Sequence, residues 1–295
     1  MKKIFRLFVK ILNLENFKLY LNIKYFYVFY IFHRNRNKEN NTIKNKYFYT
    51  SDRNKLIQFK DIYKNKECVL IGNGPSLKTV DFEKLQNIKT FASNSFYLMS
   101  EKNNFFPDFY SIEDSLVLER NFESLEKINN YDVKQKFFSH ELKKYIDNED
   151  IFYFFKDSRF ISDAYNIKPE TNIKFSKNFS KASYSGHSVT YVNMQLAYFM
   201  GFKTVYLVGM DFNYVMPNYM KENLNFFRNN FVDNNHFYSN EFKSGEKFYN
   251  PQLQKVKIAF EKARYTFESD NRNIINLTDG GELHVFDRDK FSNVF

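Results

Sequence analysis

Cysteine is almost missing from this sequence, and tryptophan is missing altogether. A single cysteine, Cys68, excludes an internal disulfide and suits a reducing compartment. Cys68 also falls inside a stretch that is predicted to be a buried strand. A packing role is therefore favoured over that of a reactive thiol.

Several motifs with a defined chemistry are also absent. The sequence has no Gly-x-Gly-x-x-Gly fingerprint, P-loop, zinc-ligand cluster, Gly-x-Ser-x-Gly elbow, nucleic-acid recognition motif or internal repeat. No uncharged apolar run reaches the ~20 residues that a membrane-spanning helix needs. No small-residue cleavage site follows the basic N-terminus, so a secretory signal is not expected.

What the sequence does contain is a high proportion of aromatic residues, 37 Phe and 22 Tyr, which argues against disorder. The length of 295 residues predicts one large domain with an appendage. The net charge of +10 favours anionic partners, although the abundance of Lys, Asn, Ile, Phe and Tyr has the character of a coding bias. Because no nucleic-acid motif is present, we expect nucleotide phosphates or anionic lipid as partners rather than nucleic acid.

Residues 1–41 form a basic, aromatic extension that ends in a polar linker. One interpretation is a helix that lies on an anionic membrane surface, with its lysines and arginines at the headgroups. The alternative is a helix packed on the main domain. We therefore expect a cytoplasmic protein, peripheral on the inner face of the plasma membrane under the first interpretation. Residues 42–295 are predicted to be a Rossmann-like nucleotide-binding transferase domain.

The stretch from Glu67 to Lys78 organises this domain. Its apolar run, Val69 to Ile71, is typical of a parallel strand that is buried on both faces. The run breaks into Gly72-Asn73-Gly74, and Pro75 and Ser76 then suit the first turn of a helix. Free N–H groups at such a turn attract phosphate. The alternative is a tight turn that binds nothing.

A second unit of the same kind follows further along the chain. A turn around Gly186 leads into a predicted helix over residues 189–200, and a strand over 205–208 then ends at Gly209 and Asp211. Two such units indicate an α/β fold with a doubly wound, mainly parallel sheet. Asn94 and Asp114 follow two further short strands, at the sheet edge where ligands bind. Residues 131–181 lack a clear periodicity, and we expect an inserted lid there.

These blocks resemble known families. Residues 71–77, 94–97 and 209–212 resemble the nucleotide-binding blocks of bacterial CMP-sialic acid-dependent sialyltransferases. Residues 107–117, 186–214 and 280–286 look closer to bacterial proteins of the MptE-like family, which are similar to 6-hydroxymethylpterin diphosphokinase. The resemblance spans roughly residues 66–290.

The sialyltransferase resemblance implies a glycosyltransferase that moves a sialic acid-like sugar from a CMP-linked donor to a surface-glycan acceptor. Nucleotide contacts are implied for Gly72, Asn73, Gly74, Pro75, Ser76, Asn94, Ser185, Gly186, Gly209, Asp211 and Phe212. From its position after a short strand, Asp114 could bind a ribose hydroxyl or a metal, or it could cap the helix that follows. The resemblance further implies that Tyr214 and Tyr219 hydrogen-bond the leaving phosphate and that His236 deprotonates the acceptor. His187 could contact phosphate or accept the proton instead. No tightly bound cofactor and no metal are expected, and self-association is left open.

The MptE-like resemblance implies an alternative, a diphosphokinase that transfers diphosphate from ATP to an alcohol. Such an enzyme needs carboxylates to hold Mg²⁺ between phosphates, and Glu113, Asp114 and Asp211 are available. A pterin substrate does not require a basic N-terminus, whereas a lipid-linked glycan acceptor could use one. A nucleotide-binding protein without catalysis is a third alternative.

Overall fold

A computed structural model describes residues 52–119, 122–158, 173–214, 226–228, 235–237, 247–249 and 251–295. The N-terminal extension and Tyr219 lie outside these residues. Among the residues that are described, no helix is long and apolar enough to cross a membrane.

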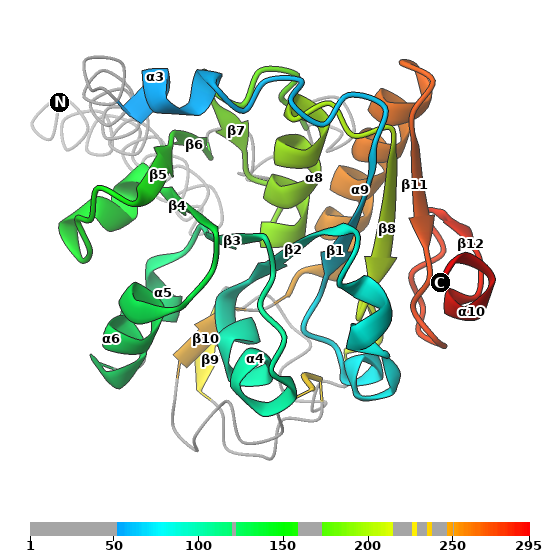
Figure 1. The fold of residues 1–295 in the computed structure, drawn as a ribbon, viewed down its shortest axis with the longest axis horizontal. Helices are drawn as coiled ribbons and strands as arrows, with labels where there is room; N and C mark the ends of the chain where they lie inside the picture. Colours follow the sequence, from blue (N-terminus) through cyan, green and yellow to red (C-terminus); the bar gives the residue numbers. More distant parts are fainter. Residues whose placement is uncertain are drawn as a thin grey trace, which may run out of the picture.

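The centre of the described chain is an eight-stranded sheet with the order β12-β11-β8-β1-β2-β3-β4-β5 (Figure 1). Every neighbouring pair in this sheet is parallel. Its strands are β1 (Glu67–Ile71), β2 (Lys89–Ser93), β3 (Phe109–Ile112), β4 (Gln135–Ser139), β5 (Ile151–Phe154), β8 (Thr204–Val208), β11 (Asn273–Asn276) and β12 (Asp287–Arg288). Two short pairs stand apart from it, β6 (Lys156–Asp157) with β7 (Ser183–Tyr184) and β9 (Phe226–Arg228) with β10 (Lys247–Tyr249).

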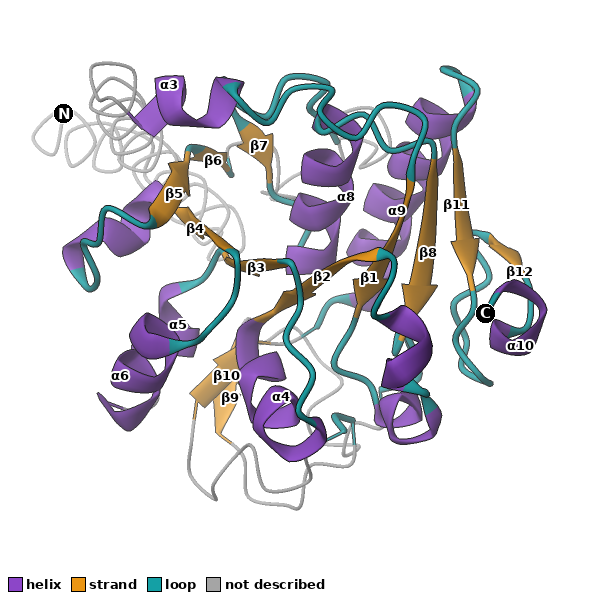
Figure 2. Cartoon of the chain, viewed as in Figure 1, coloured by secondary structure: helices purple, strands orange, loops and turns teal. Residues whose placement is uncertain are grey.

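Helices cover both faces of the sheet (Figure 2). The long helices α8 (Val189–Phe199) and α9 (Leu253–Glu268) pack on one face. The other face is covered by shorter elements. Helix α3 (Asp52–Ile57) lies on the same face as α8 and α9, because its Leu56 belongs to the same core cluster. The remaining helices are η1 (Pro75–Thr79), η2 (Phe82–Leu85), η3 (Asn94–Phe96), α4 (Tyr97–Asn103), α5 (Ser115–Glu119), α6 (Phe122–Asn130), η4 (His140–Lys144) and α10 (Phe291–Val294). This arrangement confirms the predicted Rossmann-like α/β class.

Strand β1 shows why the central run has no polar alternation. Cys68 and Leu70 belong to the core cluster under α8 and α9, whereas Val69 and Ile71 belong to the cluster on the opposite face. All four side chains are at most 1% exposed. A parallel strand with helices on both sides needs apolar residues at every position, as the sequence predicted.

The path of the chain makes β1 the turning point of the sheet. From β1 the chain proceeds outward through β2, β3 and β4 to β5, and it then returns to place β8 on the other side of β1. The connections after β1 and β8 therefore leave the sheet edge in opposite directions. In open α/β sheets, such a switch point is where ligands bind.

The expectation of an insertion or lid over residues 131–181 is wrong for the first part of that range. Residues 135–139 and 151–154 form β4 and β5, the last two strands of the sheet. Phe137 and Phe138 are both fully buried, on opposite faces of the sheet. The absence of alternation here reflects a strand buried on both sides rather than irregular structure.

Candidate active site

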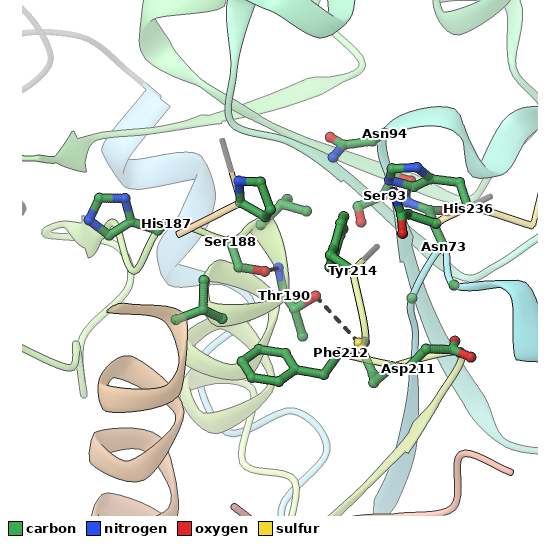
Figure 3. A pocket seen from close by; sticks show the side chains of 18 of the residues that line it. Asn73, Ser93, Asn94, His187, Ser188, Thr190, Asp211, Phe212, Tyr214 and His236 are labelled. Atoms are coloured by element: carbon green, nitrogen blue, oxygen red, sulfur yellow. Dashed lines mark hydrogen bonds between the residues drawn. The ribbon is translucent and has the colours of Figure 1, made fainter. Parts of the chain in front are cut away.

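A cavity of about 270 Å³ lies at the carboxyl edge of the sheet (Figure 3). Residues that directly follow four neighbouring strands line it: 72–74 after β1, 93–95 at the end of β2, 113–114 after β3 and 209–214 after β8. Residues 187–190, at the start of α8, and the segment 235–236 complete much of the wall. The cavity thus occupies the switch point that the strand order creates.

Gly72 and Gly74 are required by backbone packing between β1 and the loop after β8. The Gly72 N–H donates to Val208 O at 2.8 Å, and the Gly74 N–H donates to Gly209 O at 2.9 Å. A Cβ atom at Gly72 would lie 2.3 Å from Gly209 O. A bulky residue at either glycine would therefore disrupt the wall itself, so it cannot test ligand binding alone.

The N-terminus of η1 is already occupied by a side chain of the protein. Asp211 accepts a hydrogen bond from the Ser76 hydroxyl at 2.7 Å and another from the Ser76 N–H at 3.2 Å. The phosphate site expected at this turn therefore holds the Asp211 carboxylate. One oxygen of this carboxylate also lies 1.8 Å from where a Cβ atom at Gly74 would be, which explains that glycine.

Asn73 lies between β2 and the segment around His236. Its side-chain Nδ2 donates to Ser93 O at 3.2 Å, and its backbone carbonyl accepts from the Phe237 N–H at 2.9 Å. The Oδ1 atoms of Asn73 and Asn94 are buried without a hydrogen-bond partner. A buried acceptor without a donor costs free energy, and a donor on a bound ligand would offset that cost.

His236 and Tyr214 stand together in the wall. Their rings are 5.8 Å apart at an interplanar angle of 80°, an edge-to-face contact. Figure 3 shows both residues near Asn73 and Ser93, with His187 at the far side of the view. The two candidate histidines therefore approach the cavity from different sides.

The wall contains an unusual number of left-handed backbone conformations. Asn94, His187 and Phe212 have φ angles of +52°, +61° and +59°, although none of them is glycine. Such conformations cost about 1–3 kcal/mol each and gather at functional sites, where the surrounding fold maintains them. Three in one cavity wall support a functional role for it.

Glu113, one of the three carboxylates considered for Mg²⁺, lines the cavity after β3. Its Oε2 atom is buried and has no hydrogen-bond partner. Burial raises the pKa of its carboxyl to about 7, an effect that Lys156 opposes and that the nearby Asp114 and Glu141 reinforce. A carboxyl that titrates near neutrality in a cavity is a candidate for proton transfer or ligand binding. The only sequence signal for it was its position after β3.

The predicted site residues separate into two groups. Those that line the cavity are Gly72, Asn73, Gly74, Asn94, Asp114, His187, Gly209, Asp211, Phe212, Tyr214 and His236. Pro75, Ser76, Ser185 and Gly186 are not part of its lining. Gly186 packs against the Tyr191 ring and Ala259, and the Ser185 N–H donates to Asp157 O.

The charged groups of the wall are all acidic. Glu113, Asp114 and Asp211 line the cavity, but no lysine or arginine does so among the residues that the structure describes. Within the same residues, no group of three or more His, Cys, Asp or Glu side chains is arranged to hold a metal ion. The three carboxylates considered for Mg²⁺ therefore do not converge there.

The fold and the cavity define a Rossmann-like α/β protein with a cavity at the switch point of its sheet. The chain belongs to the family described as 6-hydroxymethylpterin diphosphokinase MptE-like, whose sequence profile matches residues 40–216, more than half of the chain. No curated protein matches the chain significantly.

Two solved structures are similar to this chain at low identity. The MAf glycosyltransferase from Magnetospirillum magneticum AMB-1 is 13% identical with a TM-score of 0.46, and the match covers 83% of this chain but only 38% of that one. The sialyltransferase CstII from Campylobacter jejuni, solved with cytidine-5'-monophosphate, is 15% identical with a TM-score of 0.42. That match covers 76% of this chain and 85% of CstII. With TM-scores below 0.5, neither likeness bears on the chemistry of this chain.

Proposed function

We propose that this protein is a transferase that binds a CMP-linked sugar donor and passes the sugar to a hydroxyl of a surface glycan. The observation that carries the proposal is the cavity at the switch point, in whose wall Asn73, Tyr214 and His236 lie together. Asn73 belongs to a block, residues 71–77, that resembles CMP-dependent sialyltransferases, and that resemblance implies the roles of Tyr214 and His236. A sialic acid-like sugar is our first expectation for the transferred group.

In the proposed reaction, the imidazole of His236 takes the proton of the acceptor hydroxyl. The acceptor oxygen then bonds to the anomeric carbon of the sugar, and the bond from that carbon to the phosphate oxygen breaks. Its electron pair remains on the released nucleotide. Tyr214 donates a hydrogen bond to that phosphate as its negative charge grows, which stabilises the transition state. Tyr219, outside the described residues, is proposed to act alongside it.

The diphosphokinase alternative depends on the carboxylates of the wall. Mg²⁺ between the phosphates of ATP is commonly held by only one or two carboxylates together with those phosphates. Asp211 holds Ser76, whereas Glu113 and Asp114 both line the cavity. We favour sugar transfer because the resemblance to CMP-dependent sialyltransferases implies roles for Tyr214 and His236 in the same wall.

The proposal is tested by thermal denaturation with CMP, CDP, UDP, GDP and ATP, each with and without Mg²⁺. A ligand at about 100 times its dissociation constant stabilises the folded state by ~2.7 kcal/mol. We expect CMP to raise the melting temperature most, without a need for Mg²⁺. Stabilisation by ATP with Mg²⁺ alone would instead establish the diphosphokinase alternative, and binding without turnover would indicate a non-catalytic protein.

A further inference from the structure

The acidic wall of the cavity conflicts with an anionic ligand. The chain as a whole has a net charge of +10, yet the described wall contains three carboxyl groups and no lysine or arginine. A nucleotide phosphate in a cavity of about 270 Å³ would therefore lie close to like charges. Loss of charge on a carboxyl would reduce this repulsion, as would protonation of His187 or His236, which line the same wall, and the comparison with a Glu113 variant separates these contributions.

Glu113 is the carboxyl best suited to lose its charge. Asp211 accepts hydrogen bonds from Ser76, which favour its ionised form. The Oε2 atom of Glu113 has no donor near it. Lys156, whose charge lowers the pKa of Glu113, donates to the backbone carbonyl of Glu113 at 2.9 Å and lies 3.6 Å from the carboxylate of Glu141.

Most of the influences around Glu113 raise the pKa of its carboxyl. Asp114 follows it in the chain, Glu141 belongs to η4 and Lys156 to β6. Burial is the largest influence and raises the pKa of Glu113, the two acids raise it further, and Lys156 only partly opposes them. The resulting pKa of about 7 leaves the free protein divided between the two charge states at neutral pH.

We propose that Glu113 meets the anionic ligand as a neutral carboxylic acid, so that binding takes up one proton. The inference rests on the proposed function for the presence of an anionic nucleotide. A protonated Glu113 removes one of the like charges, and it offers an O–H donor from a carboxyl whose Oε2 atom has no hydrogen-bond partner in the free protein. Proton uptake by Glu113 differs from neutralisation of the site by Mg²⁺, because Mg²⁺ would bind the ionised form of the carboxylates.

The sign of the pH dependence follows from linkage. If the ligand binds the protonated form, its affinity decreases by up to about tenfold per pH unit once the pH exceeds the pKa of Glu113 in the free protein. A site neutralised by Mg²⁺ shows the opposite trend, with affinity that increases as the carboxyl ionises. Glu113→Gln imitates the neutral acid in shape and supplies an N–H donor.

The test is isothermal titration of CMP into the full-length protein between pH 6 and pH 8.5, with wild type and Glu113→Gln compared. The phosphate of CMP itself titrates at about pH 6, and this titration changes the affinity of both proteins equally. We expect the wild-type affinity to fall by about tenfold or more across the range relative to Glu113→Gln, and the variant to bind more tightly than wild type at pH 8.5. Equal pH profiles, or weaker binding by the variant at pH 6, would overturn the inference.

Glu141→Gln provides a matched variant away from the cavity wall. It removes a negative charge that raises the pKa of Glu113, so the wild-type pH profile should shift to lower pH with its shape retained. An unshifted profile would show that another group takes up the proton, and it would also count against the inference.

A measurement without ligand separates this inference from the proposed function. Because the raised pKa makes the folded state bind the proton more tightly, wild type should lose stability relative to Glu113→Gln as the pH rises from 5 to 7. Urea unfolding at each pH detects this difference, and no difference would overturn the inference. If CMP does not bind at any pH, the donor assignment fails, and the pH series is repeated with the nucleotide that the thermal panel ranks first. If no nucleotide binds, both the proposed function and the inference about Glu113 fail.

Discussion

At the scale of single residues, His236 is held in a segment that lines the cavity. The neighbouring Phe237 N–H donates to the backbone carbonyl of Asn73, which ties this segment to the turn after β1. Tyr214 contacts the imidazole edge-to-face. A histidine held in this way can take a proton from a hydroxyl in the cavity, whereas His187 lies elsewhere in the wall (Figure 3).

We predict that His236→Ala lowers turnover by roughly 10²–10⁴-fold, the range for loss of a general base, while CMP affinity changes little. The measurement is steady-state transfer from a CMP-sugar donor together with titration of CMP. His284→Ala is the matched control, because His284 is 68% exposed and pairs with Glu282 outside the cavity. Full turnover in His236→Ala with a loss in His187→Ala would assign the base to His187.

At the scale of elements, α3 packs the start of the described chain against the edge of the sheet formed by β5. Asp52, at its first position, is 3% exposed and lies 3.3 Å from both His140 Nδ1 and Lys143 Nζ of η4. Phe59, just after the helix, makes edge-to-face contacts with Phe137 of β4 and Phe152 of β5. The helix therefore covers the two strands that the sequence analysis did not recognise.

We predict that Asp52→Asn lowers the free energy of unfolding by about 1.5–3 kcal/mol at pH 7, the usual contribution of hydrogen bonds to charged groups. Burial alone would raise the pKa of Asp52, but the close approach of His140 and the hydrogen bond accepted from Lys143 lower it overall. A lowered pKa in an acid stabilises the fold above the unfolded pKa, and this stabilisation disappears as the pH falls through the folded pKa. The gap between wild type and variant should therefore close below about pH 4 in urea unfolding.

The control for this prediction is Asp147→Asn. Asp147 also faces Lys143, at 3.6 Å, but it is 68% exposed. Exposed ion pairs of this kind contribute about 0–1 kcal/mol, so the variant should unfold close to wild type. If Asp147→Asn lowered the free energy of unfolding as much as Asp52→Asn does, the stabilisation would come from pairing with Lys143 rather than from the burial of Asp52.

At the scale of the whole molecule, the N-terminal part of the described chain and the cavity lie at opposite ends of α8. Residues after α3 pair with the C-terminal end of that helix, through Asp61 N–H to Phe199 O and Tyr63 N–H to Met200 O. Thr190, at the other end, lines the cavity. The 11 residues of α8 span roughly 16 Å, so the residues that follow α3 lie away from the cavity.

We predict that deletion of residues 1–41 leaves CMP binding unchanged. The deletion should also release the protein from anionic vesicles, because it removes the basic and aromatic residues of the extension. Vesicle sedimentation in increasing salt is the measurement, and salt should weaken the contact of the full chain. A steep fall in melting temperature after the deletion would instead indicate that the segment packs on the main domain.

The sequence by itself determined the elements whose patterns are local. The apolar run of β1, the helix around Leu196 and Ala197, and the breaks at Gly72 and Gly209 were all predicted, and the structure places them as expected. These features depend on the conformational preferences of neighbouring residues and on burial at regular intervals. Such preferences are visible in a short window of sequence.

Only the tertiary structure decided how those elements combine. The pairing of β1 with β8, the two outer strands β4 and β5, and the contact of Asp211 with Ser76 all join segments far apart in the chain, 135 positions in the last case. The charge state of Glu113 likewise depends on burial and on Asp114, Glu141 and Lys156 converging from separate elements. Long-range electrostatics and packing depend on the whole fold, because distance and solvent access set their strength, and no local pattern records either one.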